Sequence, residues 1–547
     1  MRDNVVIIGS GLSGLTAAIN LAKNNCNVIL VSQMGSECTQ SVMAAGGINA
    51  SLNTKGENDS SEEHFKETIK SGMYLADSEA VWNMTENAEE VVRWLHSIGT
   101  AFNLDENYNI ELRNFGGQKK KRTAFAMSNT GKQVMAALIE QTRRYELLGL
   151  IKRYPHHCFQ EIILNEKMIC IGCLIKDEYS DKIEVLYGKV VAASGGMNGL
   201  FGITTGSSLN TGVVTADLFF HGVKAANLEM IQYHPTTYRT QSRLFLISES
   251  ARAEGGRLFI YRNNEKWYFL EEKYPQMKNL IARDELSLEI YNVCQEYNLE
   301  YVLLDMTQVC EEVFRSKLFG FVDSCIEFIN INPMTEYLPV YPAIHYFMGG
   351  IYVDSKHRTN IEGVYAIGEC ACQYHGANRL GGNSLLSTVY GGKIVAQAVL
   401  EDGNTEEVGT YSASYISQYI EKVQGIKEHP NYISINKLKK HKNEVMNQCM
   451  GIVRDEDRIE YAIGIIHDIL KQTEQGYDPR ADLYTQYMFY KEVILCLAML
   501  YSARDRKESR GAHFRKDYPD SNDKHFRKTT VASYVNETIQ IDFVDIN

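Results

Sequence analysis

The order of apolar and polar residues predicts a strand, a helix and a second strand at the start of the chain. Val5 to Ile8 is a short apolar run that is typical of a buried parallel strand. The helix-forming segment Leu15 to Lys23 follows, and a second apolar run covers Val28 to Val31. A βαβ unit of about 30 residues is the length expected for dinucleotide binding.

Three further elements can be predicted from the pattern. Met168 to Ile175 is almost wholly apolar and contains Cys170 and Cys173, so we expect a buried strand there rather than a zinc or redox site. Glu460 to Thr473 and Tyr484 to Asp505 have apolar residues at helical spacing and contain no proline. The C-terminal part of the chain is therefore predicted to be helical.

Length and composition indicate a globular protein of two or three domains. The chain has 547 residues, of which 44% are hydrophobic and 23% charged. Its formal net charge of −12 argues against a nucleic-acid surface, which needs a concentrated basic face. Small acidic substrates remain compatible with this charge, because a few buried arginines and histidines are enough to bind carboxylates.

Targeting and cysteine patterns favour a cytoplasmic protein. No apolar run is long enough to span a bilayer, and the first residues lack a signal-peptide layout. We therefore expect no direct membrane insertion. The 12 cysteines are scattered, which predicts reduced thiols rather than a disulfide framework.

Gly9, Gly11 and Gly14 stand in GxGxxG spacing between the first strand and the helix. Gly9 is expected to permit the tight turn, Gly11 the approach of a pyrophosphate, and Gly14 close packing of helix and strand. This arrangement predicts nucleotide binding and leaves FAD and NAD open. Ser32 follows the second strand where an acidic residue usually binds the ribose, so that contact must be made differently.

The segment Ser41 to Ala50, SVMAAGGINA, resembles the flavin-contacting loop of the succinate dehydrogenase and fumarate reductase flavoproteins. Other blocks similar to that family follow in the family's order. They are FGGQ at 115–118, QYHPT at 232–236, SESARAEGG at 248–256, ARD at 282–284, HYFMGG at 345–350, GECACQYHGANRLGGNSL at 368–385 and RKESRGAHFRKDYP at 506–519. The ordered set spans nearly the whole chain and is far more specific than any one block.

The resemblance implies an α/β fold in three parts. We expect a discontinuous Rossmann-like FAD-binding domain at 1–227 and 343–400, an inserted α+β capping domain at 228–342, and a helical domain at 401–547. It also implies the FAD contacts, which are Gly9, Ser10, Gly11, Ser13, Gly14, Ser32, Ser41, Ala45, Gly46, Gly47, Glu369, Ser384 and Leu385. One polar contact is missing, because Val213 stands where many members have an aspartate.

The same resemblance implies a site for a small dicarboxylate such as fumarate. The residues expected to bind it are His234, Ser248, His345, Arg379 and Phe115. Arg379 is the strongest carboxylate partner, because its planar guanidinium binds both oxygens at once.

The catalytic residues implied by the family pattern are Arg283, Glu249 and His234. Flavin N5 would deliver a hydride to one alkene carbon, and Arg283 would protonate the other. Arginine is a weak acid, so this role needs a proton relay. Glu249 matches the acidic member of that relay, and Asp284 is expected to orient Arg283.

Two departures from the family pattern bear on the reaction. Gln40 aligns with the histidine that carries covalent FAD in membrane-bound members, so FAD is predicted to be noncovalent and the reducing direction favoured. The main alternative is L-aspartate oxidase, which also lacks the covalent link. That enzyme has a glutamate in the block equivalent to FGGQ, whereas this chain has Phe115, which favours a substrate without an amino group.

Two other hypotheses remain. Thr237 and Ser248 differ from the common family residues at the pocket, which leaves reduction of another 2-enoate open. A non-catalytic flavin-binding subunit is disfavoured by the complete set of site residues.

The chain has no iron-sulfur ligand pattern and no CxxCH haem motif. We therefore expect electrons from a separate iron-sulfur subunit or another donor, with any attachment to the inner face of a membrane made through that partner. Outside the site, His375 is expected to be structural, His513 and Arg515 to brace the C-terminal domain, and Lys119 to Arg122 to be a solvated loop.

Overall fold

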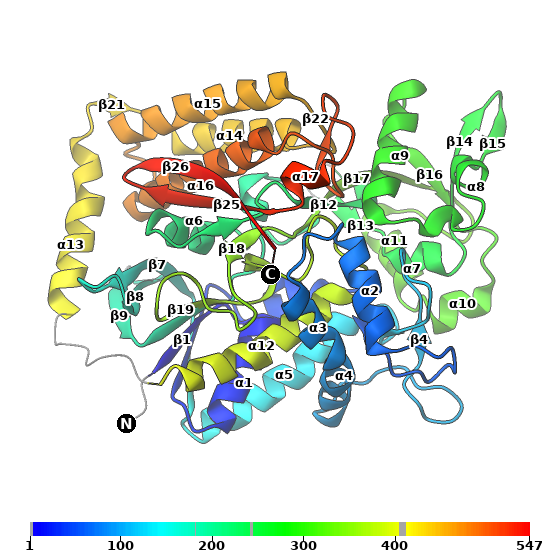
Figure 1. Ribbon diagram of the computed structural model, residues 1–547, viewed down its shortest axis with the longest axis horizontal. Coiled ribbons are helices and arrows are strands. Elements are labelled where there is room, and N and C mark those ends of the chain that lie inside the picture. The colour runs from blue at the N-terminus through cyan, green and yellow to red at the C-terminus, as the bar shows by residue number, and fades with distance from the viewer. Residues whose placement is uncertain (1–3, 181, 241–243, 404–411, 547) are drawn as a thin grey trace.

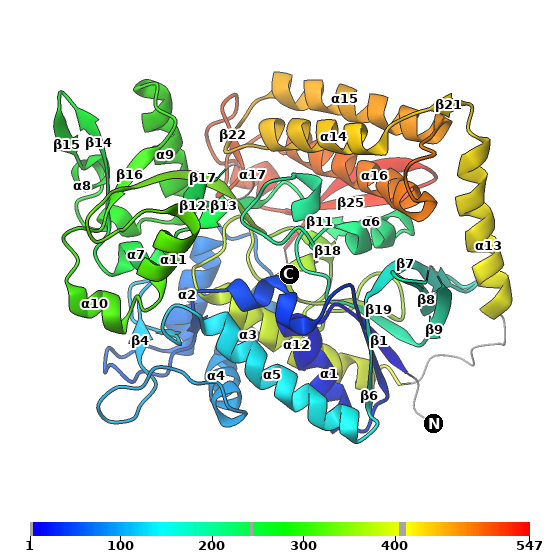
Figure 2. The same ribbon diagram turned by 180° about the vertical axis from the view of Figure 1, so that it is seen from behind.

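A computed structural model describes residues 4–180, 182–240, 244–403 and 412–546. The described chain has three regions, seen in Figure 1 as a blue and cyan layer below, a green region at one side and an orange and red region above. Figure 2 shows the same three regions from behind. None of the helices in these ranges is long and apolar enough to cross a membrane.

A five-stranded parallel sheet forms the centre of the nucleotide-binding region. Its strands occur in the order β19-β10-β1-β2-β6. The strands are β1 (Val5–Ile8), β2 (Val28–Ser32), β6 (Ile151–Pro155), β10 (Lys189–Ala192) and β19 (Val364–Ala366). This sheet and its first crossover helix confirm the βαβ unit predicted from the apolar pattern.

Alternate residues of β1 belong to two separate cores on the two faces of the sheet. Val5 and Ile7 pack with one group of helices, whereas Val6 and Ile8 pack with a small antiparallel sheet. The helices are α1 (Leu12–Lys23), α5 (Thr130–Leu147) and α12 (Asn383–Glu401), with α2 (Ser61–Ser71), α3 (Ser78–Glu86) and α4 (Ala88–Ser97) beside them. The small sheet contains β7 (His157–Leu164), β8 (Cys170–Asp177) and β9 (Ile183–Tyr187).

The green region comprises residues 231–347. It is built on a six-stranded sheet of order β13-β12-β17-β16-β14-β15. Its strands are β12 (Ile231–Arg239), β13 (Leu244–Leu246), β14 (Arg257–Arg262), β15 (Glu265–Trp267), β16 (Val302–Asp305) and β17 (Leu338–Phe347). Its helices are α7 (Glu249–Ala253), α8 (Phe269–Lys273), α9 (Arg283–Glu296), α10 (Glu311–Ser316) and α11 (Phe321–Ile329). The long strands β12 and β17 carry the chain into and out of this region, and both end beside the nucleotide-binding part.

The C-terminal region is mostly helical but ends in a β-hairpin. Its helices are α13 (Ser412–Gly425), α14 (Ile435–Cys449), α15 (Glu456–Gln475), α16 (Leu483–Asp505) and the short α17 (Asp523–Phe526). The hairpin strands β25 (Thr529–Val535) and β26 (Thr538–Val544) extend a sheet with β11 (Ala225–Ala226), β18 (Gly350–Tyr352) and β20 (Ala371–Cys372). The helical domain predicted for residues 401–547 did not include this hairpin.

The predicted elements agree with the structure to within a few residues. Both predicted C-terminal helices lie inside α15 and α16. Cys170 and Cys173 are fully buried in β8, as expected of a core strand. Helix α1 begins three residues earlier than predicted, because Gly11 is extended and acts as its N-cap.

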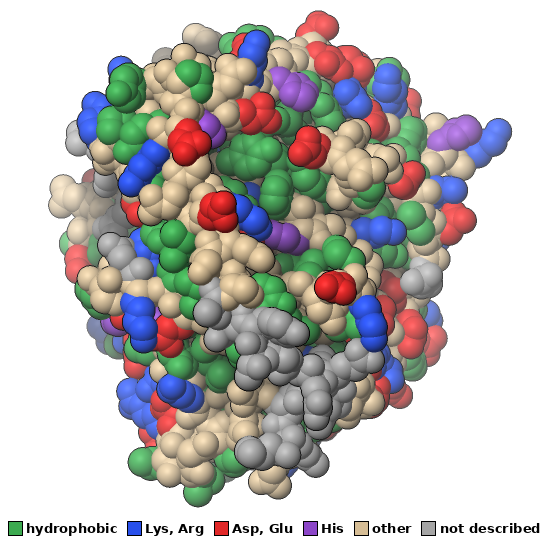
Figure 3. Space-filling view, turned by 90° about the vertical axis from the view of Figure 1, so that its left-hand side faces the viewer, with side chains coloured by type: hydrophobic (Ala, Val, Ile, Leu, Met, Phe, Trp, Pro, Cys, Tyr) green, Lys and Arg blue, Asp and Glu red, His purple; other side chains and the backbone are tan. Residues whose placement is uncertain are grey.

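The basic run at 119–122 is not a uniformly solvated loop. Arg122 is fully buried, with Nη2 2.8 Å from Oδ1 of Asp59 and Nη1 2.9 Å from Oε2 of Glu67. The two carboxylates compensate its charge in the core, and a sequence pattern around the run cannot reveal them. On the face in Figure 3, basic and acidic side chains are interspersed rather than gathered into a basic patch.

Candidate functional site

A cavity of about 710 Å³ runs between the nucleotide-binding region and the green region. It extends from the glycine-rich turn after β1, along the loop at 41–47, to side chains of β12, α7, α9 and β17. Of the residues predicted to bind FAD or the dicarboxylate or to act in catalysis, all but Gly14 line this cavity. Residues separated by more than 370 positions are therefore brought to one continuous space.

Two glycines shape the turn at one end of the cavity. Gly9 has φ +118°, and a Cβ there would lie 2.2 Å from the carbonyl oxygen of Ala193. A Cβ on Gly14 would lie 1.9 Å from the carbonyl oxygen of Gly9. Gly14 thus packs α1 against the turn, as predicted, instead of lining the cavity.

Gln40 joins the loop at 41–47 to a second loop across the cavity. Its Oε1 accepts hydrogen bonds from the backbone N–H of Ser207 at 2.9 Å and from Nδ2 of Asn210 at 2.6 Å. A carboxamide cannot form a histidyl link to a flavin. In this chain the side chain of Gln40 forms hydrogen bonds to another loop of the same protein instead.

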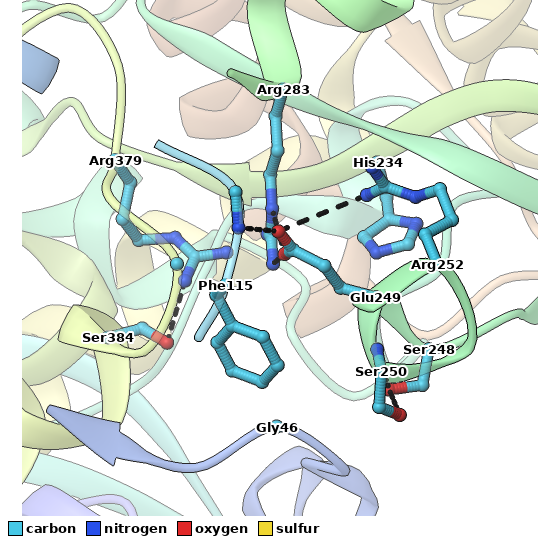
Figure 4. A network of polar contacts seen from close by, with 12 residues as sticks. Gly46, Phe115, His234, Ser248, Glu249, Ser250, Arg252, Arg283, Arg379 and Ser384 are labelled. Atoms are coloured by element: carbon cyan, nitrogen blue, oxygen red, sulfur yellow. Dashed lines mark hydrogen bonds and ion pairs between the residues drawn. The ribbon is translucent and has the colours of Figure 1, made fainter. Parts of the chain in front are cut away.

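Arg283 and Glu249 form a buried ion pair at the other end of the cavity, shown in Figure 4. Arg283 donates two hydrogen bonds to Oε2 of Glu249, from Nε at 3.0 Å and from Nη2 at 2.5 Å. The other oxygen of Glu249 accepts the backbone N–H of Gly116 at 2.6 Å. Nη1 of Arg283 donates to Oε1 of Gln232 at 3.2 Å. These contacts fix Arg283, at the first turn of α9, with its guanidinium in the cavity wall.

Arg252 extends this pair and was not predicted from the sequence. It is one helical turn after Glu249 on α7, with Nη2 4.0 Å from Oε1 of that carboxylate. Its Nη1 donates to the carbonyl oxygen of Asn279 at 2.6 Å, and the side chain is fully buried. The spacing of three residues within SESARAEGG was the available signal, since i and i+3 share a helix face.

The charges of this cluster can be assigned from burial and neighbours. Burial raises the pKa of Glu249, but the charges of Arg283 and Arg252 outweigh it and lower that pKa to about 2. Burial and the charge of Arg283 lower the pKa of Arg379 to about 9, so it stays protonated at neutral pH. Three guanidinium groups and one carboxylate therefore leave two net positive charges.

Two histidines face the same part of the cavity in their neutral form. Burial lowers the pKa of His234 and of His345 well below the ordinary value, and the nearby arginines add to this effect. Nδ1 of His345 lies 2.8 Å from Oγ1 of Thr205, and Nδ1 of His234 lies 3.2 Å from the carbonyl oxygen of Thr236. The ring centroids are 5.1 Å apart. Neither Nε2 atom has a partner among the described residues, so both are available to a ligand.

Arg379 and Ser248 complete the polar lining. Nη1 of Arg379 donates to Oγ of Ser384 at 2.9 Å, and its guanidinium carbon lies 4.3 Å from the ring centre of Tyr346. Its buried Nε has no partner in the described part of the chain. Ser248 caps α7 and accepts a hydrogen bond from Oγ of Ser250 at 2.8 Å.

Phe115 contributes an apolar wall close to the arginines. Figure 4 shows its ring between Gly46 and the cluster of Arg379 and Glu249. The side chain is 2% exposed, and a Cβ on Gly46 would lie 3.5 Å from the ring. Phe115 itself brings no charge to this point of the wall, and the nearby carboxylate of Glu249 is held by Arg283 and the N–H of Gly116.

Two residues beside the site have contacts that were not foreseen, and the expectation for one of them, Thr237, was wrong. Asp284 has no direct hydrogen bond to Arg283 among the described residues, but it is linked to it through two amides. Its Oδ1 accepts Nδ2 of Asn378 at 2.8 Å, Oδ1 of Asn378 accepts Nε2 of Gln232 at 2.9 Å, and Oε1 of Gln232 accepts Nη1 of Arg283. Thr237 does not touch the cavity, because an irregularity of β12 turns its hydroxyl to the carbonyl oxygen of Tyr341 at 2.6 Å. Of the two pocket substitutions, only Ser248 lines it.

Comparison with known proteins agrees with this geometry. Residues 4–385 match the FAD binding domain family, and residues 439–547 match the fumarate reductase flavoprotein C-terminal family. The chain is 34% identical to the succinate dehydrogenase flavoprotein subunit of Bacillus subtilis strain 168, over 100% of this chain and 97% of that protein. This chain belongs to the succinate dehydrogenase and fumarate reductase flavoprotein family. It is an FAD-dependent oxidoreductase, and the predicted fold class and cofactor are confirmed.

Other relatives of this flavoprotein differ in their named activity. The L-aspartate oxidase of Pyrococcus furiosus is 32% identical over 96% of this chain and 98% of that enzyme. A quinol fumarate reductase structure from E. coli superposes with a TM-score of 0.91 at 25% identity, covering 100% of this chain and 97% of that chain. An adenylylsulfate reductase from Archaeoglobus fulgidus has a TM-score of 0.78 at 16% identity, covering 100% of this chain and 96% of that chain, and shows the fold alone.

The lining of the flavoprotein cavity fits FAD. The turn at Gly9 and the start of α1 form a cradle for a pyrophosphate, and Oγ of Ser10 is buried there with no hydrogen-bond partner among the described residues. Glu369 lies further along, and burial raises its pKa to about 7. It already accepts the backbone N–H of Phe347 at 3.1 Å. A glycine-rich cradle with an unpaired hydroxyl, followed by further polar groups along one cavity, is the lining expected for a long polar cofactor.

Proposed function

We propose that this flavoprotein interconverts fumarate and succinate and favours the reduction of fumarate. The observation that carries the proposal is the charge of the site, where Arg252, Arg283, Arg379 and Glu249 leave two net positive charges beside two neutral histidines. A dicarboxylate carries two negative charges, so it would neutralise this excess. Its two ends would be held by Arg379 and by the free Nε2 atoms of His234 and His345, with Ser248 as a further hydrogen-bonding group.

FAD, when bound, supplies hydride exchange with a substrate carbon. In the reducing direction, Arg283 would give a proton to the other carbon of the double bond, so that one hydride and one proton convert fumarate into succinate. Arg379 would stabilise the negative charge that develops on the substrate carboxylate during this transfer.

Glu249 and Arg252 would return the proton to Arg283. The short contacts between Arg283 and ionised Glu249 provide the first step, and Arg252 on the far oxygen provides the next. The low pKa of Glu249 suits a group that accepts and passes on a proton without retaining it.

The contacts of Gln40 support noncovalent FAD, because its carboxamide is hydrogen-bonded to Ser207 and Asn210 and cannot form the link. We propose that a separate protein, such as an iron-sulfur subunit, delivers electrons in the cytoplasm or at the inner face of a membrane. Several relatives are named as flavoprotein subunits, which is in keeping with a partner protein.

The second candidate function is oxidation of L-aspartate, suggested by the enzyme of Pyrococcus furiosus. An aspartate substrate carries an ammonium group, which needs a negative charge or acceptor nearby. Phe115 offers none, and Glu249 is already bound by two arginines. The site therefore supports fumarate better than aspartate.

The test is to reduce the purified flavoprotein anaerobically and to add fumarate, while aspartate is added to the oxidised protein. We expect rapid flavin reoxidation by fumarate, no bleaching by aspartate, and release of all flavin by acid. Bleaching by aspartate would establish the second candidate instead. If neither fumarate nor aspartate changes the redox state of the flavin, other 2-enoates are the next substrates to test.

A further inference from the structure

Arg113 is a buried arginine that has no carboxylate partner among the described residues. It ends β4 (Leu112–Arg113) and is 5% exposed. Its guanidinium carbon lies 4.2 Å from the ring centre of Phe125 and 5.2 Å from that of Phe115. Its Nε and Nη1 atoms have no hydrogen-bond partner within those residues. Glu249, Glu254 and Glu111 act on this charge only from a distance, and a buried charge without a direct ion pair is costly, so its position calls for an explanation.

The hydrogen bonds that Arg113 does make go to the loop at 41–47. Its Nη2 donates to the carbonyl oxygen of Gly46 at 2.6 Å and to that of Ala45 at 3.3 Å. Oγ1 of Thr130 donates to the same Gly46 oxygen at 2.9 Å. Two successive carbonyl groups of the loop are therefore held by the protein.

The backbone N–H groups of the same loop, unlike its carbonyl groups, are not held by the described part of the protein. Those of Ala45, Gly46 and Gly47 donate to no acceptor among the described residues, and all three residues line the cavity. A bound ligand is the natural acceptor for them. The loop thus presents donors to the cavity while a cation lies behind it.

We propose that Arg113 stabilises the reduced flavin and so raises the midpoint potential of the cofactor. The inference rests on the proposed position of the flavin against the loop at 41–47. Reduced flavin is an anion near neutral pH, whereas oxidised flavin is neutral, so a fixed buried cation favours the reduced form. No covalent link is available here to tune the potential, because Gln40 replaces the histidine. Arg113 is a positioning residue, since it acts through the loop and through its field.

The test is a dye-equilibration titration of the flavin potential in the holoprotein without substrate. R113Q removes the charge and keeps an amide donor for the loop, whereas R113K keeps the charge. T130V is the matched control, because it removes one hydrogen bond to Gly46 and leaves the charge in place. R113M serves as the neutral variant if R113Q does not retain FAD.

We expect R113Q to lower the two-electron reduction constant at least tenfold, which is about 30 mV, while R113K and T130V change it by less. We expect T130V to weaken FAD binding, measured by titrating the apoprotein. An unchanged potential in both R113Q and R113M overturns the proposal, and so does a T130V shift equal to that of R113Q.

These results are independent of the reaction. Fumarate is added to each preparation after the titration. If fumarate fails to reoxidise the wild-type flavin while R113Q still lowers the potential, the proposed function fails and the role of Arg113 stands. If the wild-type protein reduces fumarate but R113Q has the same flavin potential as the wild type, only the proposed role of Arg113 fails.

Discussion

Replacing Arg283 by methionine tests the proposed proton donor. In the structure Arg283 gives two hydrogen bonds to Glu249, whose side chain is 3% exposed. The variant leaves that carboxylate buried with only Arg252 at 4.0 Å and the N–H of Gly116 as partners. Breaking a buried ion pair from one side costs about 3–5 kcal/mol of folding free energy. Loss of a general acid lowers turnover by about 10²–10⁴-fold.

The two effects can be separated with the double variant R283M/E249Q. It removes the unpaired charge, so we expect most of the lost stability to return while turnover stays low. Stability is measured by urea unfolding of the holoprotein, and turnover by fumarate-dependent oxidation of a reduced viologen dye. Turnover of R283M above a tenth of the wild-type value, or its return in the double variant, would refute the assignment of Arg283.

Three further predictions use other parts of the structure. Burial lowers the pKa of His357 from 6.5 to about 4, so its neutral form is favoured in the fold and stability falls by up to about 3 kcal/mol as pH drops between these values. Urea unfolding between these two pH values should show a smaller loss of folding stability for H357Q than for the wild type. Equal losses would contradict the lowered pKa of His357. Burial and the charge of Glu285 raise the pKa of Asp284 to about 6, so its contribution to stability is lost as pH rises through 6. D284N should therefore have a higher Tm than the wild type at pH 8 and a smaller difference at pH 5; a constant difference would argue against this. Phe115→Glu places a like charge beside a dicarboxylate and should raise the KM for fumarate about tenfold or more, with F115L as the control.

Local patterns predicted the parts of the fold that depend on nearby residues. The strand at Val5–Ile8, the turn at Gly9 and the helices α15 and α16 each have their signal within one short segment. The candidate site could be assembled only because blocks from distant segments occur in a known family order. The cavity lining supports that assembly, since all the residues predicted for FAD binding, substrate binding and catalysis except Gly14 line it.

What could not be predicted depends on contacts between distant segments. Arg122 is buried because Asp59 and Glu67 fold over it, and nothing near 122 indicates this. Asp284 was expected to orient Arg283, but the link between them runs through Asn378 and Gln232, which lie in distant segments of the chain. Strand β25 of the hairpin pairs with β11, a strand of two residues some 300 positions earlier, which is too short to give a pattern.

That hairpin has a consequence for how the protein is made. A ribosome releases the chain from its N-terminus, so the glycine-rich turn and the loop at 41–47 emerge long before β25 and β26. The sheet containing β11 and β18 gains these two strands only after residues 529–544 have been synthesised. The edge of β11 must therefore remain without this partner until that late segment has emerged. A truncation near residue 528 removes only two strands from the sequence, but in the fold it exposes the edge of β11 in the sheet that also holds β18 and β20.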